Sequence, residues 1–251
     1  MDFENKLQLK LKLAQLPEIL TEGESLRQGK ACTFIRTVSC NVFCRSDIYQ
    51  NCCCDSTYTF KDGPETIIWS LEEIITYVGN LGCKNISITG GEPLLHKEEI
   101  YWLLYFLDFQ GYDITIETNG TLDFSWIIES FPRVHIIGDW KCPAAFGKIT
   151  NSKMLESNLY LYRKNDALKF VVAREDFEEV EKVLERSKVY ERTNVYISPC
   201  WGVIKFKEVS DWITSHLKYG CILSIQQHKL LMADEVDILK ISKKSADNIH
   251  L

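Results

Sequence analysis

The segment NISITGGEPLLHKEEIYWLLYFLDFQG, residues 85–111, contains one strand–turn–helix unit. Residues 85–89 form a short run that is rich in β-branched side chains, which favours a strand. Residues 97–109 have the length and apolar content of a helix, and Gly111 stands where a C-terminal cap is expected. The turn between them, residues 90–93, begins with two glycines that allow the backbone to approach a ligand closely.

The same alternation recurs along the chain. Further strands are expected at residues 31–36, 113–117, 134–138, 167–172, 195–199 and 222–226. Further helices are expected at residues 67–81, 126–131, 154–162, 175–186 and 209–217. Strands that alternate with helices predict an α/β fold with a parallel sheet. About six parallel strands are too few for a closed eight-stranded barrel, so we expect an open, partial βα barrel.

The composition limits the kind of protein. The chain has 251 residues, 45% of them hydrophobic, which is enough for one core, so we expect a single domain over residues 1–251. Lys and Arg number 29 against 35 Asp and Glu, and the net charge of −6 disfavours binding to nucleic acid or to a membrane surface.

The chain also lacks sequence signals for export or membrane insertion. Residues 1–15 are charged and helical in pattern, unlike a secretion signal. No apolar run reaches the roughly 20 residues needed to span a bilayer. A cytoplasmic location is therefore expected. Ten cysteines are many for a reducing compartment, where clustered cysteines more often serve metal or redox chemistry than disulfides.

Half of these cysteines follow the strand expected at residues 31–36. Cys40, Cys44, Cys52, Cys53 and Cys54 lie within fifteen residues. Zinc and iron–sulfur clusters both bind thiolates, so this density predicts a metal site. A structural zinc loop is the simpler alternative, but such loops normally use paired Cys-x-x-Cys units, and no clean pair is present here.

A cysteine loop followed by a Gly-Gly-Glu-Pro turn after the next predicted strand resembles the radical S-adenosylmethionine (SAM) superfamily. The resemblance implies that three cysteines hold three irons of a [4Fe–4S] cluster. SAM then chelates the fourth iron through its amino and carboxylate groups. The cluster donates one electron to the sulfonium, and cleavage of the C–S bond gives a 5′-deoxyadenosyl radical.

Several further segments narrow the resemblance. In order, they are residues 18–24, 54–56, 117–121, 139–143, 169–172, 198–199 and 226–229. Together they resemble the 7-carboxy-7-deazaguanine synthases over most of the chain. The resemblance implies that the radical takes a hydrogen from C6 of 6-carboxy-5,6,7,8-tetrahydropterin, and that ring contraction with loss of ammonia gives 7-carboxy-7-deazaguanine. It also implies regeneration of SAM, assistance by Mg²⁺, a flavodoxin or ferredoxin as electron donor, and a homodimer.

The resemblance assigns roles to individual residues. The cluster ligands are expected to be Cys40, Cys44 and Cys54, and the Mg²⁺ ligand Ser56. Contacts to SAM are expected from Gly90, Gly91 and Glu92, with Glu92 accepting from the ammonium, and from Asn119, Asp55 and Lys141. Contacts to the substrate are expected from Glu24, Arg36, Thr89, Gln226 and His228. Arg36 would pair with the substrate carboxylate, and Glu24 would accept from the amino-amide edge of the pterin.

Each of these roles has a simpler alternative. Arg36 could be a surface residue of a strand, and His228 a structural histidine. Ser56 could cap a helix, and Asn119 could be only the turn residue that Asn-Gly pairs favour.

The chain departs from the family pattern in three places. The usual loop is Cys-x3-Cys-x2-Cys, but here nine residues separate Cys44 from Cys54, which indicates an insertion at residues 45–53. Cys44 keeps the usual spacing and is favoured as the second ligand, with Cys52 and Cys53 as alternatives. The usual Gln-Gly-Glu-Gly run begins here with Glu22, which would change the hydrogen-bond donors of the substrate pocket. The tail at residues 230–251 is longer than expected.

Two other functions compete with this interpretation. Another small radical SAM enzyme, such as an activase that makes a glycyl radical on a partner protein, would not bind the pterin. A zinc-stabilised binding module without catalysis would be colourless and would not bind SAM.

Overall fold

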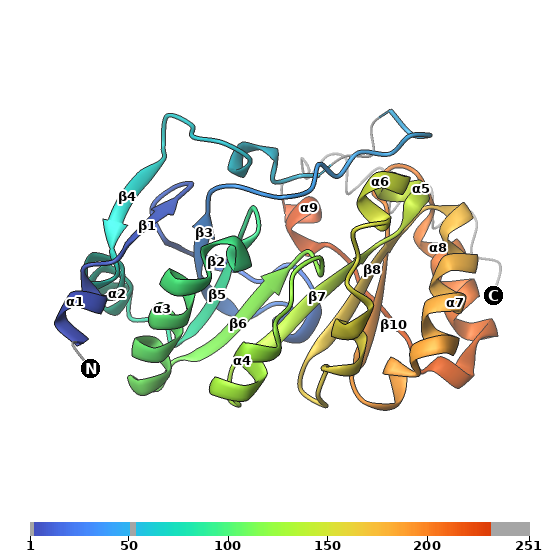
Figure 1. Ribbon diagram of the computed structural model, residues 1–251. Helices are drawn as coiled ribbons and strands as arrows, with labels where there is room; N and C mark the ends of the chain where they lie inside the picture. Colours follow the sequence, from blue (N-terminus) through green and yellow to red (C-terminus); the bar gives the residue numbers. More distant parts are fainter. Residues whose placement is uncertain (1–2, 51–53, 232–251) are drawn as a thin grey trace.

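The computed structural model describes residues 3–50 and 54–231. Ten strands of the described residues form one sheet (Figure 1). The strands are β1 Lys10–Leu13, β2 Glu18–Thr21, β3 Ala31–Thr37, β4 Ile67–Ser70, β5 Asn85–Gly90, β6 Asp113–Thr118, β7 His135–Lys141, β8 Ala167–Val172, β9 Asn194–Pro199 and β10 Ile222–Leu223. Their order in the sheet is β10-β9-β8-β7-β6-β5-β3-β1-β4, with β2 paired to β3 outside this path.

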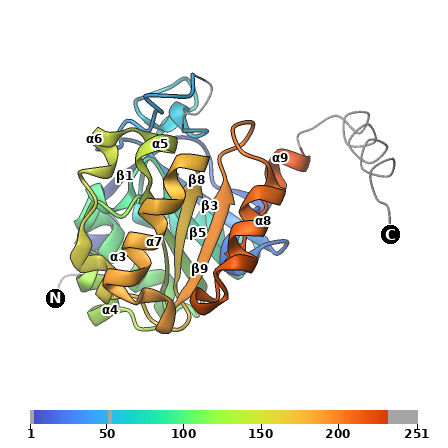
Figure 2. The same ribbon diagram turned by 90° about the vertical axis from the view of Figure 1, so that its right-hand side faces the viewer.

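The described residues also contain α-helices, most of which lie between successive strands. They are α1 Phe3–Leu7, α2 Leu71–Leu81, α3 Lys97–Phe109, α4 Ser125–Ser130, α5 Pro143–Phe146, α6 Lys148–Asn151, α7 Phe177–Ser187, α8 Phe206–Ser215 and α9 Gln227–Leu231. In Figure 2, which looks from the β9 end, α3, α4 and α7 lie together on one side of the sheet. No helix in the described ranges is long and apolar enough to cross a membrane.

The predicted fold class is confirmed. Neighbouring strands from β3 through β10 pair in parallel along the sheet, and the order does not return to its start, so the sheet is open. Three antiparallel strands that the sequence did not indicate, β1, β2 and β4, extend it beside β3. The helical pattern expected over residues 1–15 is limited to α1, because β1 follows directly.

The helix expected at residues 67–81 begins four residues later. Residues Ile67–Ser70 form strand β4, in which Ile68 is 59% exposed. Ser70 ends the strand and caps α2, because its hydroxyl accepts from the N–H of Glu73 and the Glu73 carboxylate accepts from the N–H of Ser70. The start of the helix is therefore set by a capping box.

Three other expected elements differ from the structure. Residues 154–162 contain only the 3-10 helix Glu156–Tyr160, and α8 is Phe206–Ser215 rather than residues 209–217. The strand expected at residues 222–226 is reduced to β10, two residues that pair with β9. Gly111 does have the left-handed backbone (φ 75°) expected just after α3.

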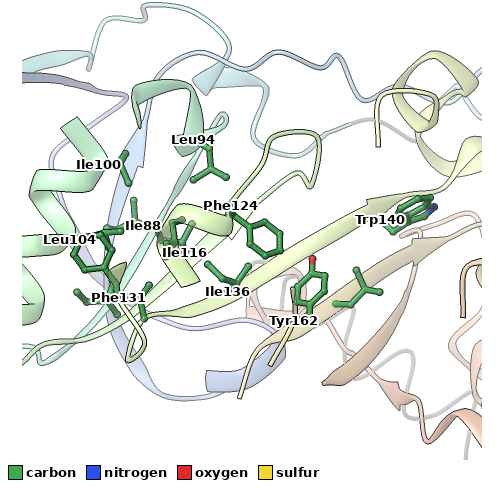
Figure 3. Packing of buried hydrophobic residues seen from close by; sticks show 14 of the residues in the cluster. Ile88, Leu94, Ile100, Leu104, Ile116, Phe124, Phe131, Ile136, Trp140 and Tyr162 are labelled. Carbon is green, nitrogen blue, oxygen red and sulfur yellow. The ribbon is translucent and has the colours of Figure 1, made fainter. Parts of the chain in front are cut away.

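Alternation along the central strands separates an apolar face from a polar face. Ile88 of β5, Ile116 of β6 and Ile136 of β7 are buried on the helix-covered face, where Ile100 and Leu104 of α3 join them (Figure 3). The residues that alternate with them along each strand, among them Thr89, Glu117 and Asp139, line a cavity on the opposite face. Because side chains alternate along each strand, the same strands contribute one set of residues to the core and the other set to the site.

Candidate active site

A cavity of about 330 Å³ lies on this polar face, at the edge where the parallel strands end. Its lining side chains come from alternate strand positions, from the loop after β3 and from residues 20–24. They include Glu22, Glu24, Phe34, Arg36, Cys40, Cys44, Cys54, Asp55, Ser56, Tyr58, Thr89, Gly90, Gly91, Glu117, Asn119, Asp139, Lys141 and Lys169. In both views the segment that follows β3 crosses this edge of the sheet (Figures 1 and 2). The cavity volume is that of a small-molecule site.

The cysteine loop brings three thiols to the cavity. Cys40, Cys44 and Cys54 all carry free thiols and all line it. The backbone N–H of Cys54 donates to the carbonyl of Cys44 (3.0 Å), so the chain leaves at Cys44 and returns beside it after the nine intervening residues. The insertion therefore keeps Cys54 next to Cys44. Cys52 and Cys53 lie outside the described residues.

The three thiols have an apolar surrounding. Cys44 packs against Val42, Ala145 and Phe146, with Cys40 and Cys54 at the edge of the same cluster. Burial raises the pKa of Cys40 and Cys44, and that of Cys54 to about 11, while Lys141 opposes the shift at each. The loop alone therefore favours neutral thiols, and a bound metal would supply the charge that stabilises thiolates.

The Gly-Gly-Glu-Pro turn fixes the start of this loop. Gly91 N–H donates to the carbonyl of Thr37 (3.0 Å), and Glu92 N–H donates to that of Ser39 (2.8 Å). A side chain on Gly90 would collide with the backbone of Thr37, and one on Gly91 with the carbonyl of Ser39. Both glycines are required by this contact between two loops. Ser39 itself has a left-handed backbone (φ 83°) immediately before Cys40.

We predict that Gly91→Ala displaces the cysteine loop. The added methyl group must push the Ser39 carbonyl away, and overpacking of this kind typically costs about 1–3 kcal/mol. Chemical unfolding and iron content after reconstitution should both fall relative to the unmodified chain. Gly63→Ala is the matched control, because no atom lies within 4 Å of its added methyl group. Equal iron content in the two variants would contradict the prediction.

Glu92 lies beneath the turn rather than on the cavity wall. It is fully buried, and its carboxylate accepts from Leu94 N–H (3.1 Å), the Thr118 hydroxyl (2.8 Å) and Asn119 N–H (2.7 Å). Burial raises its pKa to about 7, although these three hydrogen bonds oppose the shift. In this structure Glu92 ties the turn to the end of β6, and the predicted contact with an ammonium group stays a prediction.

Asn119 connects the end of β6 to the cysteine loop. Its amide N–H group lies 3.7 Å from the Cys40 sulfur and donates to the Asn41 side chain (2.9 Å). Its amide oxygen accepts from the backbone and hydroxyl of Thr121 (3.0 and 2.6 Å). The residue is therefore a turn residue, as its simpler interpretation held, and it also positions Cys40.

Alternating charges run across the floor of the cavity. Lys141 pairs with Asp139 (2.5 Å), Asp139 with Lys169 (3.3 Å), and Lys169 with Glu24 (2.7 Å). Burial lowers the pKa of both lysines, but Asp139 and the other nearby anions more than offset it and raise the pKa overall. Burial also raises the pKa of Asp139, and the two ammonium groups outweigh it, so that this pKa is lowered. Asp139 and the two lysines are thus held in their charged forms.

Three polar residues of the cavity, Glu117, Asp139 and Lys169, were not predicted as site residues from the sequence. Glu117 accepts from the Ser87 and Thr89 hydroxyls (both 3.0 Å), and it lines the cavity with Asp139 and Lys169. The signal that could have found them is a charged residue within an otherwise apolar predicted strand or directly after it, since a buried strand rarely carries an unpaired charge.

The remaining predicted residues fall into two groups. Arg36, Thr89, Asp55 and Ser56 line the cavity with Glu24. The Arg36 guanidinium lies over the Phe34 ring (4.7 Å to its centre) and makes no ion pair with any residue that the structure describes. Ser56 occupies the N-cap position of the 3-10 helix Thr57–Thr59, but its side chain makes no capping hydrogen bond.

Gln226 and His228 are less well placed. Gln226 is buried, is not among the cavity-lining residues, and its side-chain oxygen has no hydrogen-bond partner within residues 3–50 and 54–231. The neighbouring Gln227 N–H donates to the carbonyl of Gly23 (2.9 Å), which brings this segment beside residues 22–24. The side chain of His228 and most of the tail, residues 232–251, lie outside the described part of the chain.

The residues of the cavity suit an iron–sulfur cluster with SAM. Three thiols offer soft ligands to iron, and the polar wall beyond them offers partners for a charged nucleoside. In the described ranges no three Cys, His, Asp or Glu side chains converge as the ligands of a single metal ion. A cluster does not require such convergence, because each thiolate binds a different iron.

An open parallel βα sheet with a cysteine loop over its carboxyl edge defines a radical SAM enzyme, and the profile of the radical SAM superfamily matches residues 35–134. The 7-carboxy-7-deazaguanine synthase of Aquifex aeolicus is 32% identical over 186 residues, which cover 71% of this chain and 73% of that protein. That of Clostridium acetobutylicum is 29% identical over 83% of this chain and 90% of its own length. The chain belongs to the 7-carboxy-7-deazaguanine synthase family.

The fold agrees with this membership. The crystal structure of QueE from Escherichia coli matches with a TM-score of 0.69 at 19% identity, covering 90% of this chain and 98% of that one. The family, the fold class and the enzyme class predicted from the sequence are thus confirmed. As a radical SAM enzyme, the protein uses a [4Fe–4S] cluster and SAM.

Proposed function

We propose that this protein converts 6-carboxy-5,6,7,8-tetrahydropterin into 7-carboxy-7-deazaguanine and ammonia, in a pathway to queuosine-type deazapurines. The observation that carries the proposal is the joint position of three thiols and a polar wall on one cavity, with Cys40, Cys44 and Cys54 at one end and Glu24 and Lys169 at the other. A radical source and a site for a polar heterocycle thus share one enclosed space.

The cysteines Cys40, Cys44 and Cys54 are the proposed cluster ligands. When bound, the cluster and SAM supply one-electron cleavage of a sulfonium and hence abstraction of a hydrogen atom from carbon. The residues of this chain bind SAM and the substrate and orient them for that chemistry. Asn119 and Lys141, which face Cys40 and Cys44, are proposed to contact SAM together with the turn at Gly90 and Gly91.

The polar wall supports recognition of the pterin. Lys169 holds one oxygen of Glu24, while the other oxygen is buried without a hydrogen-bond partner among the described residues. That oxygen is proposed to accept from the amino-amide edge of the substrate, because a buried acceptor without a donor is costly. Arg36 lies on the same wall and is proposed to bind the substrate carboxylate bidentately.

Other features of the proposal concern the surroundings of the reaction. Ser56 and the adjacent Asp55 line the cavity with hydroxyl and carboxylate oxygens, which suit a hard Mg²⁺ ion. A flavodoxin or ferredoxin is the proposed electron donor, since reduction of such a cluster requires a low-potential partner. A homodimer in the cytoplasm completes the proposal.

An anaerobic assay tests this function. Protein reconstituted with iron and sulfide is mixed with SAM, Mg²⁺, a reductant and 6-carboxytetrahydropterin. We expect SAM-dependent 7-carboxy-7-deazaguanine, detected by mass spectrometry. Formation of 5′-deoxyadenosine without the deazapurine would support the radical chemistry and contradict the proposed substrate. Omission of Mg²⁺ should lower the rate, and an unchanged rate would overturn the role of Ser56.

A further inference from the structure

Three carboxyl groups share the substrate end of the cavity. Glu22 and Glu24 come from the loop after β2, and Glu117 comes from β6. Lys169 is the cation whose charge lowers the pKa of Glu22, and this lysine is already paired with Glu24 (2.7 Å) and Asp139 (3.3 Å). The two ammonium groups of Lys169 and Lys141 cannot neutralise four anions in a partly closed site, so at least one carboxyl group is favoured in its protonated form.

Hydrogen bonds decide which carboxyl group holds the proton. Glu117 accepts from two hydroxyl groups, those of Ser87 and Thr89 (both 3.0 Å), and Glu24 accepts from the Lys169 ammonium. Glu22 accepts from one neutral donor, the N–H of Gly23 (3.0 Å). Donors stabilise the ionised form, so Glu22 is the least stabilised anion of the three.

The other groups that face Glu22 do not change this outcome. Cys32 of β3 has its pKa raised by burial to about 12 and stays a neutral thiol. Arg27, which lies beside Cys32, is committed to Asp113 and to the carbonyl of Ile86. Burial, and after it the charges of Glu117 and Glu24, raises the pKa of Glu22 to about 8, while Lys169 and the Gly23 N–H oppose the shift.

The backbone holds this side chain in one place. Glu22 N–H donates to the carbonyl of Lys30, and the carbonyl of Glu22 accepts from Gly29 N–H (both 2.8 Å). The residue is 4% exposed and lines the cavity, with Oε1 occupied by the N–H of Gly23. A proton on Oε2 would therefore belong to a fixed O–H donor in the substrate pocket.

We propose that Glu22 binds the substrate as a neutral carboxylic acid, donating a hydrogen bond to an acceptor atom of the heterocycle while Glu24 accepts as a carboxylate. A buried carboxylic acid can serve as a donor at neutral pH. Glu22 and Glu24 together then bind one acceptor and one donor on the same edge of the ring. An amino-amide heterocycle has this pattern. This inference rests on the proposed function, because it assigns a specificity residue to that substrate.

The pH dependence follows from the sign of the shift. Below about 8 Glu22 is protonated and can donate; above it the carboxylate repels the acceptor atom and the neighbouring Glu24. KM for the pterin should therefore rise about tenfold from pH 7 to pH 9 in the unmodified chain. Glu22→Gln keeps a neutral donor at every pH, so its KM should not show this rise between pH 7 and pH 9.

The matched control is Glu65→Gln, an exposed glutamate outside the cavity. It should keep the pH profile of the unmodified chain, which would show that the loss of the rise is specific to position 22. Parallel KM profiles for the unmodified chain and Glu22→Gln would overturn the proposal. So would loss of binding by Glu22→Gln at pH 7, since it would mean that the charged form binds.

An infrared titration of the purified protein gives a readout that needs no turnover. The difference between the unmodified chain and Glu22→Gln should contain the C=O band of a protonated acid at pH 7, lost with a midpoint near pH 8. Glu117→Gln should move this midpoint to lower pH, because it removes one repelling charge. A carboxylate band at pH 7 would overturn the proposal. Failure of the proposed function would appear instead as absence of deazapurine from the unmodified chain at every pH.

Discussion

Cys44→Ala is expected to abolish both the iron–sulfur cluster and the formation of 7-carboxy-7-deazaguanine. Cys44 is 4% exposed at the base of the cavity, and its carbonyl binds the returning backbone at Cys54. Each of the three thiolates would bind one iron directly, so the loss should exceed the roughly 10- to 100-fold effect of removing an outer-sphere partner. Iron and sulfide content, the visible spectrum and the anaerobic assay measure this result.

Two cysteine variants make the Cys44 experiment decisive. Cys83→Ala removes a free thiol outside the cavity and should leave iron content and activity unchanged. Cys52→Ala should also have a mild effect. If Cys52→Ala lost the cluster while Cys44→Ala stayed brown and active, the second ligand would lie within the insertion at residues 45–53.

The second large effect is expected for Lys169→Met, which should lower the free energy of unfolding by about 3–5 kcal/mol, the usual cost of breaking a buried ion pair. The Lys169 side chain is 10% exposed and pairs with both Glu24 and Asp139. Methionine retains the apolar stem but leaves two buried carboxylates with one fewer cation. Urea unfolding at neutral pH measures the change.

The control for this variant is Lys182→Met on α7. Lys182 pairs with Glu178 one helical turn away, with both side chains more than half exposed, and such pairs contribute little. Its unfolding midpoint should match that of the unmodified chain. Equal midpoints for Lys169→Met and Lys182→Met would show that the buried charges are not a major source of stability. Product formation should fall only in Lys169→Met, because Glu24 then loses its fixed position.

The sequence determined the elements whose signals are local. The strand, turn and helix within residues 85–111 are all present, since β-branched runs, a helical apolar face and a glycine cap act over a few residues. The cysteine loop and the Gly-Gly-Glu-Pro turn were enough to predict the superfamily. The start of α2 at Leu71 was missed, because the apolar pattern continues through β4 and only the capping box marks the boundary.

The antiparallel strands β1, β2 and β4 depended on distant pairing. Lys10 of β1 pairs with Ser70 of β4, sixty positions later, and each strand is only four residues long. A four-residue strand has little pattern of its own, and its hydrogen bonds come from a partner that local sequence does not specify. These strands therefore became visible only in the folded sheet.

The candidate site divides in the same way. Its cysteines and glycines were recognisable from spacing, but the pairing of Lys169 with Glu24 joins residues 145 positions apart. Tertiary contacts also bring Cys54 beside Cys44 and bury the carboxyl groups of Glu92 and Glu22. Spacing along the chain determines which residue types are available, whereas burial and the arrangement of opposite charges, which set protonation and contact, arise only when the parallel strands bring their polar faces together.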